Sequence, residues 1–245
     1  MDDFTSAFHS QVAVVTGATR GIGEAIAHRL AAMKMTVVLL ARDRDRLEVV
    51  REAIASKGGS ADVFPCDLHN EEAIDGLGKH IRLNYARCDV LVNCAGIGEL
   101  GKPLHEMEVE DWDALMATNL RAPFLMIRAL APMMIQQESG HIINISSLAG
   151  KNPLPNGAAY SASKWGLNGL TYSVAEELRK FNIRVSVVAP GSVNTGFGGR
   201  GDSGSFKDEA WKVQPDDVAG VVEMLVRQAP QCFISEVLVR PTRKL

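Results

Sequence analysis

The sequence is poor in the features that mark nucleic-acid-binding, membrane-embedded or secreted proteins. It has no long run of lysine or arginine, and 26 basic against 29 acidic residues give a formal net charge of −3. This balance predicts neither nucleic acid nor a membrane as a partner. No apolar stretch approaches the roughly 20 residues that cross a bilayer. The opening residues, MDDFTSAFHSQ, are acidic and polar, so we expect neither a signal peptide nor a transit peptide.

Cysteine and histidine are too scattered to indicate a disulfide framework or a metal centre. The six histidines show neither H-x-x-H nor H-x-x-x-H spacing, so we expect no metal. No C-x-x-C pair is present, and reduced thiols in a cytoplasmic protein are expected. The four cysteines are Cys66, Cys88, Cys94 and Cys232.

Short runs rich in valine and isoleucine alternate with longer helical patterns. The expected strands are 11–16, 36–41, 61–66, 88–93, 140–146, 183–189 and 234–239. The expected helices are about 22–34, 43–57, 70–85, 110–137, 158–181 and 215–228. Strands that are apolar on both faces and alternate with helices predict an α/β fold, a Rossmann-type doubly wound parallel sheet of about seven strands. No linker interrupts the chain, so residues 1–245 are expected to form one domain.

A glycine-rich turn follows the first expected strand. Residues Thr16–Gly23 read TGATRGIG and lead directly into a helix. Glycine allows a tight turn and close approach of the backbone to a pyrophosphate, which the N–H groups of the helix start would bind. This predicts a dinucleotide site that contains Gly17, Thr19, Arg20, Gly21, Ile22 and Gly23.

The end of the second expected strand carries the residues expected to distinguish NADP(H) from NAD(H). Arg42 follows that strand, and Arg20 lies within the glycine turn. Two guanidinium groups near one 2′-phosphate favour NADP(H). Alternatively, Arg42 is only a solvated residue at a helix start. Asp43 could contact a ribose, although its position more naturally caps the next helix.

A tyrosine and a lysine four residues apart form the candidate catalytic pair. Tyr160 and Lys164 share one face of an expected helix. A nearby ammonium lowers the pKa of a phenol from its usual value near ~10, which suits acid–base chemistry. Ser146 and Ser147 close an expected strand, where a hydroxyl can bind a substrate oxygen. The alternatives are an incidental surface pair and a serine pair that only caps a helix or lies in a loop.

Seven motifs in order resemble the short-chain dehydrogenase/reductase family over essentially the whole length. They are Thr16–Gly23, Cys66-Asp67-Leu68, Asn93-Cys94-Ala95-Gly96, Thr118-Asn119, Ser146-Ser147, Tyr160-x-x-x-Lys164 and Pro190-Gly191. The resemblance implies that Asp67 and Leu68 meet the adenine. It places Asn93, Ala95 and Gly96 at the central part of the cofactor, and Pro190, Gly191, Val193 and Thr195 at the nicotinamide.

The same resemblance implies the catalytic set Asn119, Ser147, Tyr160 and Lys164. Ser147 rather than Ser146 is the expected catalytic serine, and Asn119 would hold a water that links Lys164 to solvent. The resemblance also implies a homo-oligomer, a tetramer or dimer, built on helices 110–137 and 158–181. Glycines at 191, 196, 198, 199, 201 and 204 predict a mobile substrate loop at about 194–212.

The expected activity is NADP(H)-dependent reduction of a ketone or aldehyde to the alcohol. The family's usual Asn-Asn-Ala-Gly reads Asn93-Cys94-Ala95-Gly96 here, a mild packing variation. The segment Ser235–Pro241 lacks the Gly-Gly tail of most 3-oxoacyl-carrier-protein reductases, which points to a branch resembling 3-hydroxy-acid dehydrogenases. A sugar or polyol dehydrogenase and a catalytically silent regulator are the alternatives. Substrate determinants are expected in 97–107, 148–158 and 194–212.

Overall fold

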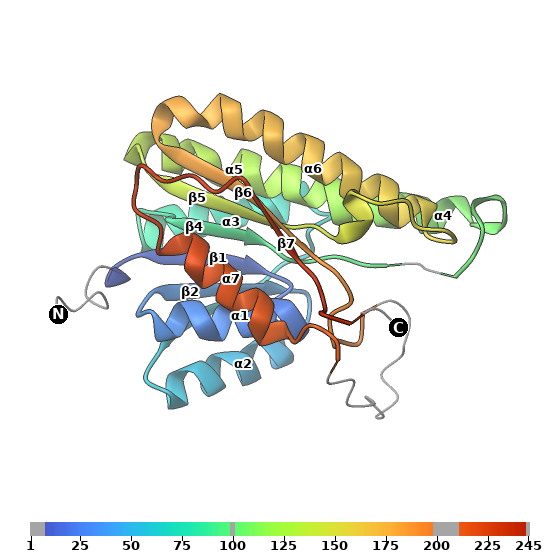
Figure 1. Ribbon diagram of the computed structural model, residues 1–245. Coiled ribbons are helices and arrows are strands. Elements are labelled where there is room, and N and C mark those ends of the chain that lie inside the picture. Colours follow the sequence, from blue (N-terminus) through green and yellow to red (C-terminus); the bar gives the residue numbers. More distant parts are fainter. Residues whose placement is uncertain (1–7, 99–100, 198–210, 244–245) are drawn as a thin grey trace.

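All strands of the structure form one parallel sheet with the order β3-β2-β1-β4-β5-β6-β7 (Figure 1). The structure is a computed structural model that describes residues 8–98, 101–197 and 211–243. The strands are β1 (Val12–Thr16), β2 (Thr36–Ala41), β3 (Ser60–Pro65), β4 (Val90–Asn93), β5 (Gly140–Ile145), β6 (Ile183–Pro190) and β7 (Glu236–Val239). The expected Rossmann-type fold with seven strands is confirmed.

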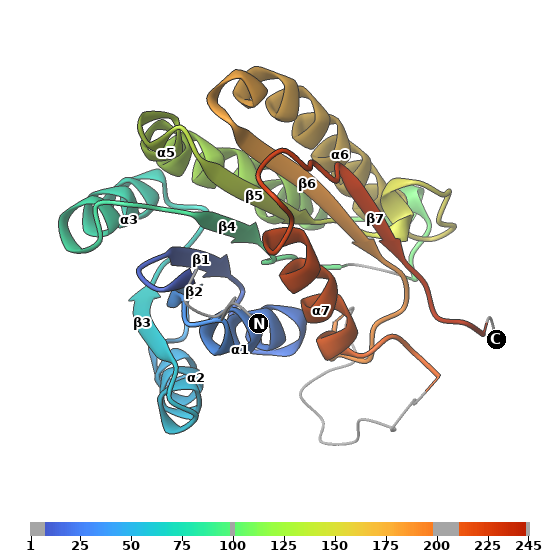
Figure 2. The same ribbon diagram turned by 60° about the vertical axis from the view of Figure 1, so that its left-hand side comes forward.

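Helices cover both faces of the sheet, which explains why its strands are apolar throughout. Figure 2 shows α1, α2 and α7 on one side and α3, α5 and α6 on the other. Val15 and Val37 belong to the core on the first side, whereas Val14 and Val38 belong to the core on the second. The helices are α1 (Gly21–Ala32), α2 (Arg44–Ser56), α3 (Glu71–Asn84), α4 (Val109–Met116), α5 (Ala122–Gln137), α6 (Ala158–Leu178) and α7 (Pro215–Val226).

The expected single helix over 110–137 is instead divided by a π-helical segment, η3 (Ala117–Arg121), between α4 and α5. Pro123 supplies the physical reason. It has no N–H to donate to the carbonyl of Asn119, and its ring would collide with that carbonyl in a regular α-helix. A wider turn relieves the collision, and such turns often lie at functional sites. The position of Asn119 in this turn bears directly on the site below.

Other expected boundaries shift by only a few residues. The helix expected over 158–181 ends as α6 at Leu178 and continues as a short 3₁₀ turn, η5 (Arg179–Phe181). Asp43 caps α2, because its Oδ1 accepts a hydrogen bond from the backbone N–H of Arg46 at 3.1 Å. Two further 3₁₀ turns are η2 (Leu104–Glu106) and η4 (Leu148–Gly150). Across the described ranges, no helix has the length and apolar character needed to span a membrane.

Candidate active site

The turn between β1 and α1 needs glycine at two positions for different reasons. Gly17 has a φ of +68°, and a Cβ there would lie 2.9 Å from the Cα of Ala95. A Cβ at Gly23 would lie 2.2 Å from the carbonyl oxygen of Gly17. The first glycine therefore allows the turn to pass close to the segment after β4, and the second allows α1 to pack on the turn. The expected glycine turn is present at the carboxyl edge of the sheet.

Thr16 joins this turn to the segment after β4, a role that the sequence did not disclose. Its buried Oγ1 accepts hydrogen bonds from the N–H groups of Cys94 and Ala95, both at 3.0 Å. The only sequence signal is a threonine directly before the glycine turn. Because its partners lie more than 70 positions away, spacing could not identify them.

Arg20 and Arg42 are both exposed at the same edge of the sheet. Arg20 directly precedes α1, and Arg42 directly follows β2. Strands β1 and β2 are paired in parallel, with Thr16 beside Leu40, so the two arginines follow neighbouring strand ends. The carboxylate of Asp43 caps α2, which supports the capping alternative for that residue.

The segment after β3 is held against the π-helical turn. His69 Nε2 and Thr118 Oγ1 lie 2.8 Å apart, and Arg121 donates a hydrogen bond to the carbonyl of His69 at 3.2 Å. Asp67 is exposed, and its Oδ1 accepts from the N–H of His69 at 3.0 Å. Leu68 packs against the core on the α3 side. These contacts fix the backbone at the expected adenine position.

Asn93 has its side chain directed into the core instead of toward the sheet edge. Its Nδ2 donates to Oδ1 of Asn144 at 2.8 Å, and Asn144 donates in turn to Thr171 at 2.8 Å. All three side chains are buried. Asn93 can therefore meet a ligand through its backbone only, which refines the role expected for it.

Tyr160 and Ser147 meet at the expected position. Tyr160 lies in α6 with 7% of its surface exposed, and its hydroxyl is hydrogen-bonded with Ser147, the residue that begins the η4 turn after β5. Ser147 Oγ also accepts from the N–H of Ala149 at 3.1 Å. Burial raises the pKa of the Tyr160 phenol, and the hydrogen bond with Ser147 opposes that rise. The phenol is thus kept protonated and placed beside a second hydroxyl.

Lys164 lies one helical turn beyond Tyr160, with its amine buried. Nζ donates a hydrogen bond to the carbonyl of Ile145 at 3.0 Å and lies 5.9 Å from the centre of the Tyr160 ring. Burial lowers the pKa of Lys164 to about 8. The prediction that the Lys164 ammonium lowers the pKa of Tyr160 is therefore wrong. Desolvation of the phenol has the larger effect on its pKa, and Lys164 Nζ is directed at a backbone carbonyl.

Asn119 connects the π-helical turn to both sides of the site. Its Nδ2 donates to the carbonyl of Ile97 at 2.9 Å and to Ser163 Oγ at 3.0 Å, and its Oδ1 accepts from the N–H of Ile97 at 2.9 Å. A Cβ at Gly96 would lie 3.3 Å from Asn119 Oδ1 and 3.7 Å from Lys164 Nζ. The structure thus brings Gly96, Asn119 and Lys164 together. Ser163, which the sequence analysis missed, belongs to the same cluster.

The segment after β6 returns to the glycine turn. The N–H of Gly191 donates to the carbonyl of Val239 at 2.8 Å, and Val193 forms an isolated bridge with Val213. A Cβ at Gly21 would lie 3.1 Å from Cγ2 of Thr195. Thr195 therefore lies beside the turn, as its expected role requires. Of the expected mobile loop at 194–212, residues 198–210 lie outside the described residues.

Among the described residues, the cysteines and the possible metal ligands do not gather into a cluster of their own. All four cysteines are unpaired, and burial raises the pKa of the Cys94 thiol, next to the site, to about 12. Within the part of the chain that the structure describes, no three histidine, cysteine or acidic side chains gather as metal ligands.

Comparisons with known proteins agree with this geometry. Residues 11–203 match the short chain dehydrogenase family. An uncharacterized oxidoreductase of Staphylococcus saprophyticus is 36% identical over 94% of this chain and 97% of its own. A 3-oxoacyl-[acyl-carrier-protein] reductase of Synechocystis is 38% identical, with 94% of each chain covered.

A solved structure shows the same fold at higher identity. It is a metagenomic short-chain oxidoreductase in complex with NADP, 53% identical, and the match covers 97% of this chain and 100% of that one with a TM-score of 0.85. The chain of serine dehydrogenase in its closed form with NADP+ is 29% identical, with a TM-score of 0.87 over 94% of each chain. With the glycine turn and the Ser147, Tyr160 and Lys164 cluster in place, this chain belongs to the short-chain dehydrogenase family of oxidoreductases.

Proposed function

We propose that this chain is an NADP(H)-dependent oxidoreductase that reduces a ketone or aldehyde to the alcohol. The observation that carries the proposal is the convergence of Ser147, Tyr160 and Lys164 beside the glycine turn. The hydroxyl, phenol and amine come from two neighbouring elements at the carboxyl edge of the sheet, where ligands of open α/β sheets bind. The NADP complex of the metagenomic relative supports the choice of cofactor.

The residues at this edge fit the dinucleotide. The close approach at Gly17 and Gly23 leaves backbone without side chains at the start of α1, which suits a pyrophosphate. Arg20 and Arg42 would bind the 2′-phosphate, and when bound the cofactor supplies or accepts a hydride. The residues proposed to hold it are Gly17, Thr19, Arg20, Gly21, Ile22, Gly23, Arg42, Asp67, Leu68, Asn93, Ala95, Gly96, Tyr160, Lys164, Pro190, Gly191, Val193 and Thr195.

The proposed mechanism assigns one task to each catalytic side chain. Ser147 donates a hydrogen bond to the substrate carbonyl oxygen and stabilises the charge that develops there. Tyr160 transfers its phenolic proton to that oxygen, and the raised pKa of the phenol keeps the proton available at neutral pH. Lys164 adds positive charge to the site and would bind ribose hydroxyls. Asn119 would hold a water that links Lys164 to solvent, from which the proton that Tyr160 gives up in reduction is replaced.

The proposed substrate is a 3-oxo acid, a 3-oxoacyl thioester or a similar carbonyl compound. The Synechocystis relative, named a 3-oxoacyl-[acyl-carrier-protein] reductase, supports this class. A screen of carbonyl compounds with NADPH, followed by the absorbance of the reduced cofactor, tests the activity. Turnover of one or more compounds is expected, and no turnover across the screen by a protein that binds NADPH would contradict the proposal.

The choice of NADP(H) has its own test at Arg42. Arg42→Ala should lower kcat/KM for NADPH and leave that for NADH nearly unchanged, because only NADPH carries the 2′-phosphate. A hydrogen bond to a charged group contributes about 1.5–3 kcal/mol, so roughly a tenfold or larger loss is expected. Arg44→Ala, in the first turn of α2, is the matched control. Equal use of NADPH and NADH by the unchanged protein would contradict the assignment.

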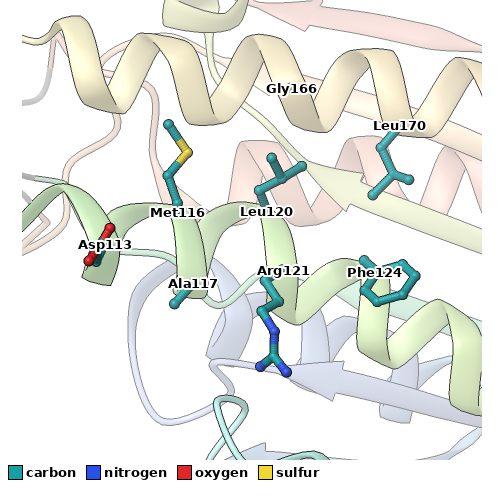
Figure 3. A pocket seen from close by; sticks show the side chains of 8 residues that line it. All are labelled: Asp113, Met116, Ala117, Leu120, Arg121, Phe124, Gly166 and Leu170. Carbon is teal, nitrogen blue, oxygen red and sulfur yellow. The ribbon is translucent and has the colours of Figure 1, made fainter.

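We also propose that the chain forms a homo-oligomer through α4, α5 and α6. Figure 3 shows a hollow on this surface that is lined mainly by apolar side chains, among them Met116, Leu120, Phe124 and Leu170 of α6, together with the charged Asp113 and Arg121. Phe124 is 46% exposed and lies on the same exposed stripe of α5 as Arg128 and Pro132. An exposed apolar patch of this kind suits a second copy of the same surface.

A further inference from the structure

Phe197 lies directly over the catalytic tyrosine. Its ring centre is 5.7 Å from that of Tyr160, and the two planes are inclined by 57°. The backbone N–H of Phe197 donates to Thr195 Oγ1 at 3.3 Å, so the short turn that holds Thr195 beside the glycine turn also positions this ring. The ring therefore extends from the segment after β6 across the site to α6.

The loop after β4 makes room for this ring. A Cβ at Gly98 would lie 2.5 Å from Cε1 and 2.9 Å from Cζ of Phe197, and a Cβ at Gly96 would lie 4.0 Å from Cε2. Gly98 is not among the described glycines with a positive φ. A positive φ therefore does not require a glycine here, whereas a side chain at this position would collide with the phenyl ring.

Other apolar side chains also pack around Tyr160. Tyr160 packs in a cluster with Leu115, Ala149 and Ala159, against which Met107 and Leu154 also pack. A carbonyl compound that reaches the Tyr160 hydroxyl would therefore place its substituents close to these side chains and to the Phe197 ring. The ring has no hydrogen-bonding group, so hydroxyl groups of a substrate would lose water there without gaining a partner.

We propose that Phe197 is a specificity-determining residue that selects carbonyl compounds with an alkyl or aryl substituent over polyhydroxylated ones. This inference rests on the function proposed above and names its substrate class. The ring of Phe197 packs against Tyr160, and the apolar side chains of Leu115, Ala149 and Ala159 pack against the same tyrosine. Polyhydroxylated carbonyl compounds of the sugar type are disfavoured, because their hydroxyl groups would be left unpaired against Phe197.

The test compares kcat/KM with NADPH for two panels of substrates. One panel contains alkyl and aryl ketones such as acetophenone, and the other contains hydroxylated carbonyl compounds such as glyceraldehyde. The unchanged protein should prefer the apolar panel. Phe197→Ala should lower the ratio of apolar to hydroxylated kcat/KM by about tenfold, mainly through KM, since a hydrophobic contact discriminates by roughly that factor. Its Kd for NADPH should stay within about twofold of the unchanged protein, which also reports that the variant folds.

Leu83→Ala removes a large apolar side chain that is 83% exposed on α3, far from the site in sequence, and should leave the ratio unchanged. When Phe197 is present, Gly98→Ala should lower kcat/KM for the apolar panel, because the new methyl group displaces the Phe197 ring. In the Phe197→Ala background the same change should have no further effect, because the ring that it displaces is gone.

The outcomes separate this inference from the function on which it rests. Preference for the hydroxylated panel, or the same ratio in Phe197→Ala, would overturn the role of Phe197 while leaving the reductase intact. Independent effects of Gly98→Ala and Phe197→Ala would overturn it too. No turnover of either panel by the unchanged protein would contradict the proposed function itself.

Discussion

At the scale of single residues, the site combines a phenol and an amine whose pKa values burial moves in opposite directions. Burial disfavours the charged form of both groups. It therefore raises the pKa of the Tyr160 phenol and lowers the pKa of the Lys164 amine to about 8. The neutral phenol is the form that donates a proton to a carbonyl. Oxidation of an alcohol requires the phenolate instead, so the two directions of the reaction should respond oppositely to pH.

Tyr160→Phe should abolish turnover while cofactor still binds. The ring and its packing remain, but the proton donor is lost, and acid–base catalysis contributes about 10²–10⁴-fold. A loss of kcat of at least about 10²-fold is expected, measured by NADPH oxidation, with NADPH affinity measured by fluorescence. In the unchanged protein, alcohol oxidation should become faster as pH rises above neutrality, because the fraction of phenolate grows with each pH unit. Carbonyl reduction should lose its proton donor only as pH approaches the pKa of the phenol, which burial raises above its usual value. Near-normal turnover by a folded Tyr160→Phe protein would show that another group supplies the proton.

Sequence reasoning predicted the glycine turn and the Tyr160 and Lys164 pair from short spacings, and it took Asn119 and Ser147 from the family resemblance. Tyr160 and Lys164 are four residues apart, and the glycine turn is continuous. It missed Thr16 and Ser163, which act through hydrogen bonds to segments distant in sequence. It also assigned the wrong direction to the tyrosine pKa, because the depth of burial and the direction of the Lys164 amine are properties of the folded chain.

At the scale of elements, the alternation of strands and helices predicted the fold class, and the apolar runs located every strand. The order of the strands follows from the crossovers and could not be read from the runs themselves. The division of the expected helix over 110–137 was missed, although Pro123 in the sequence carried the signal. That omission matters, because the wide turn is where Asn119 bonds to Ile97 and Ser163.

The junction between β1 and the segment after β4 offers a test at this scale. Thr16→Val keeps the shape of the side chain but leaves the N–H groups of Cys94 and Ala95 without their acceptor. Each buried unpaired group costs about 1–3 kcal/mol, so urea unfolding should show a loss of at least about 2 kcal/mol. Thr16→Ser retains the hydroxyl and should stay close to the unchanged protein. Equal stability of the valine and serine variants would indicate that these hydrogen bonds contribute nothing.

At the scale of the whole molecule, the apolar surface on α4, α5 and α6 should join copies of the chain. Phe124→Asp places a charge on that surface, and an unpaired charge cannot be buried without a large penalty. We expect light scattering at micromolar concentration to show an oligomer for the unchanged protein and a smaller species for the variant. Leu83→Asp, an equally drastic change of an exposed leucine on α3, should leave the oligomer intact. A monomeric unchanged protein would contradict the proposed assembly.

Acid stability of the whole chain should depend on one histidine at the opposite edge of the sheet from the site. His141, at the start of β5, is buried, and Nε2 lies 2.8 Å from Ser186 Oγ. Because Ser186 donates its own proton to the carbonyl of Ile234, Nε2 carries the imidazole hydrogen. Nδ1 is buried without a hydrogen-bond partner in the described structure. Burial first, and then the charge of Arg184, lower the pKa of His141 to about 3.

The sign of the resulting pH dependence follows from proton linkage. Above pH 6.5, His141 is neutral in both the folded and the unfolded chain, and its contribution to stability is constant. Between pH 6.5 and about 3 only the unfolded chain binds the proton. As the pH is lowered through this range, the free energy of unfolding therefore falls by about 1.4 kcal/mol for each pH unit. His141→Gln cannot titrate and should show a slope shallower by about one proton when urea unfolding is measured at pH 6, 5 and 4 at fixed protein concentration. An unchanged slope would mean that His141 takes up a proton in the folded protein as readily as in the unfolded chain.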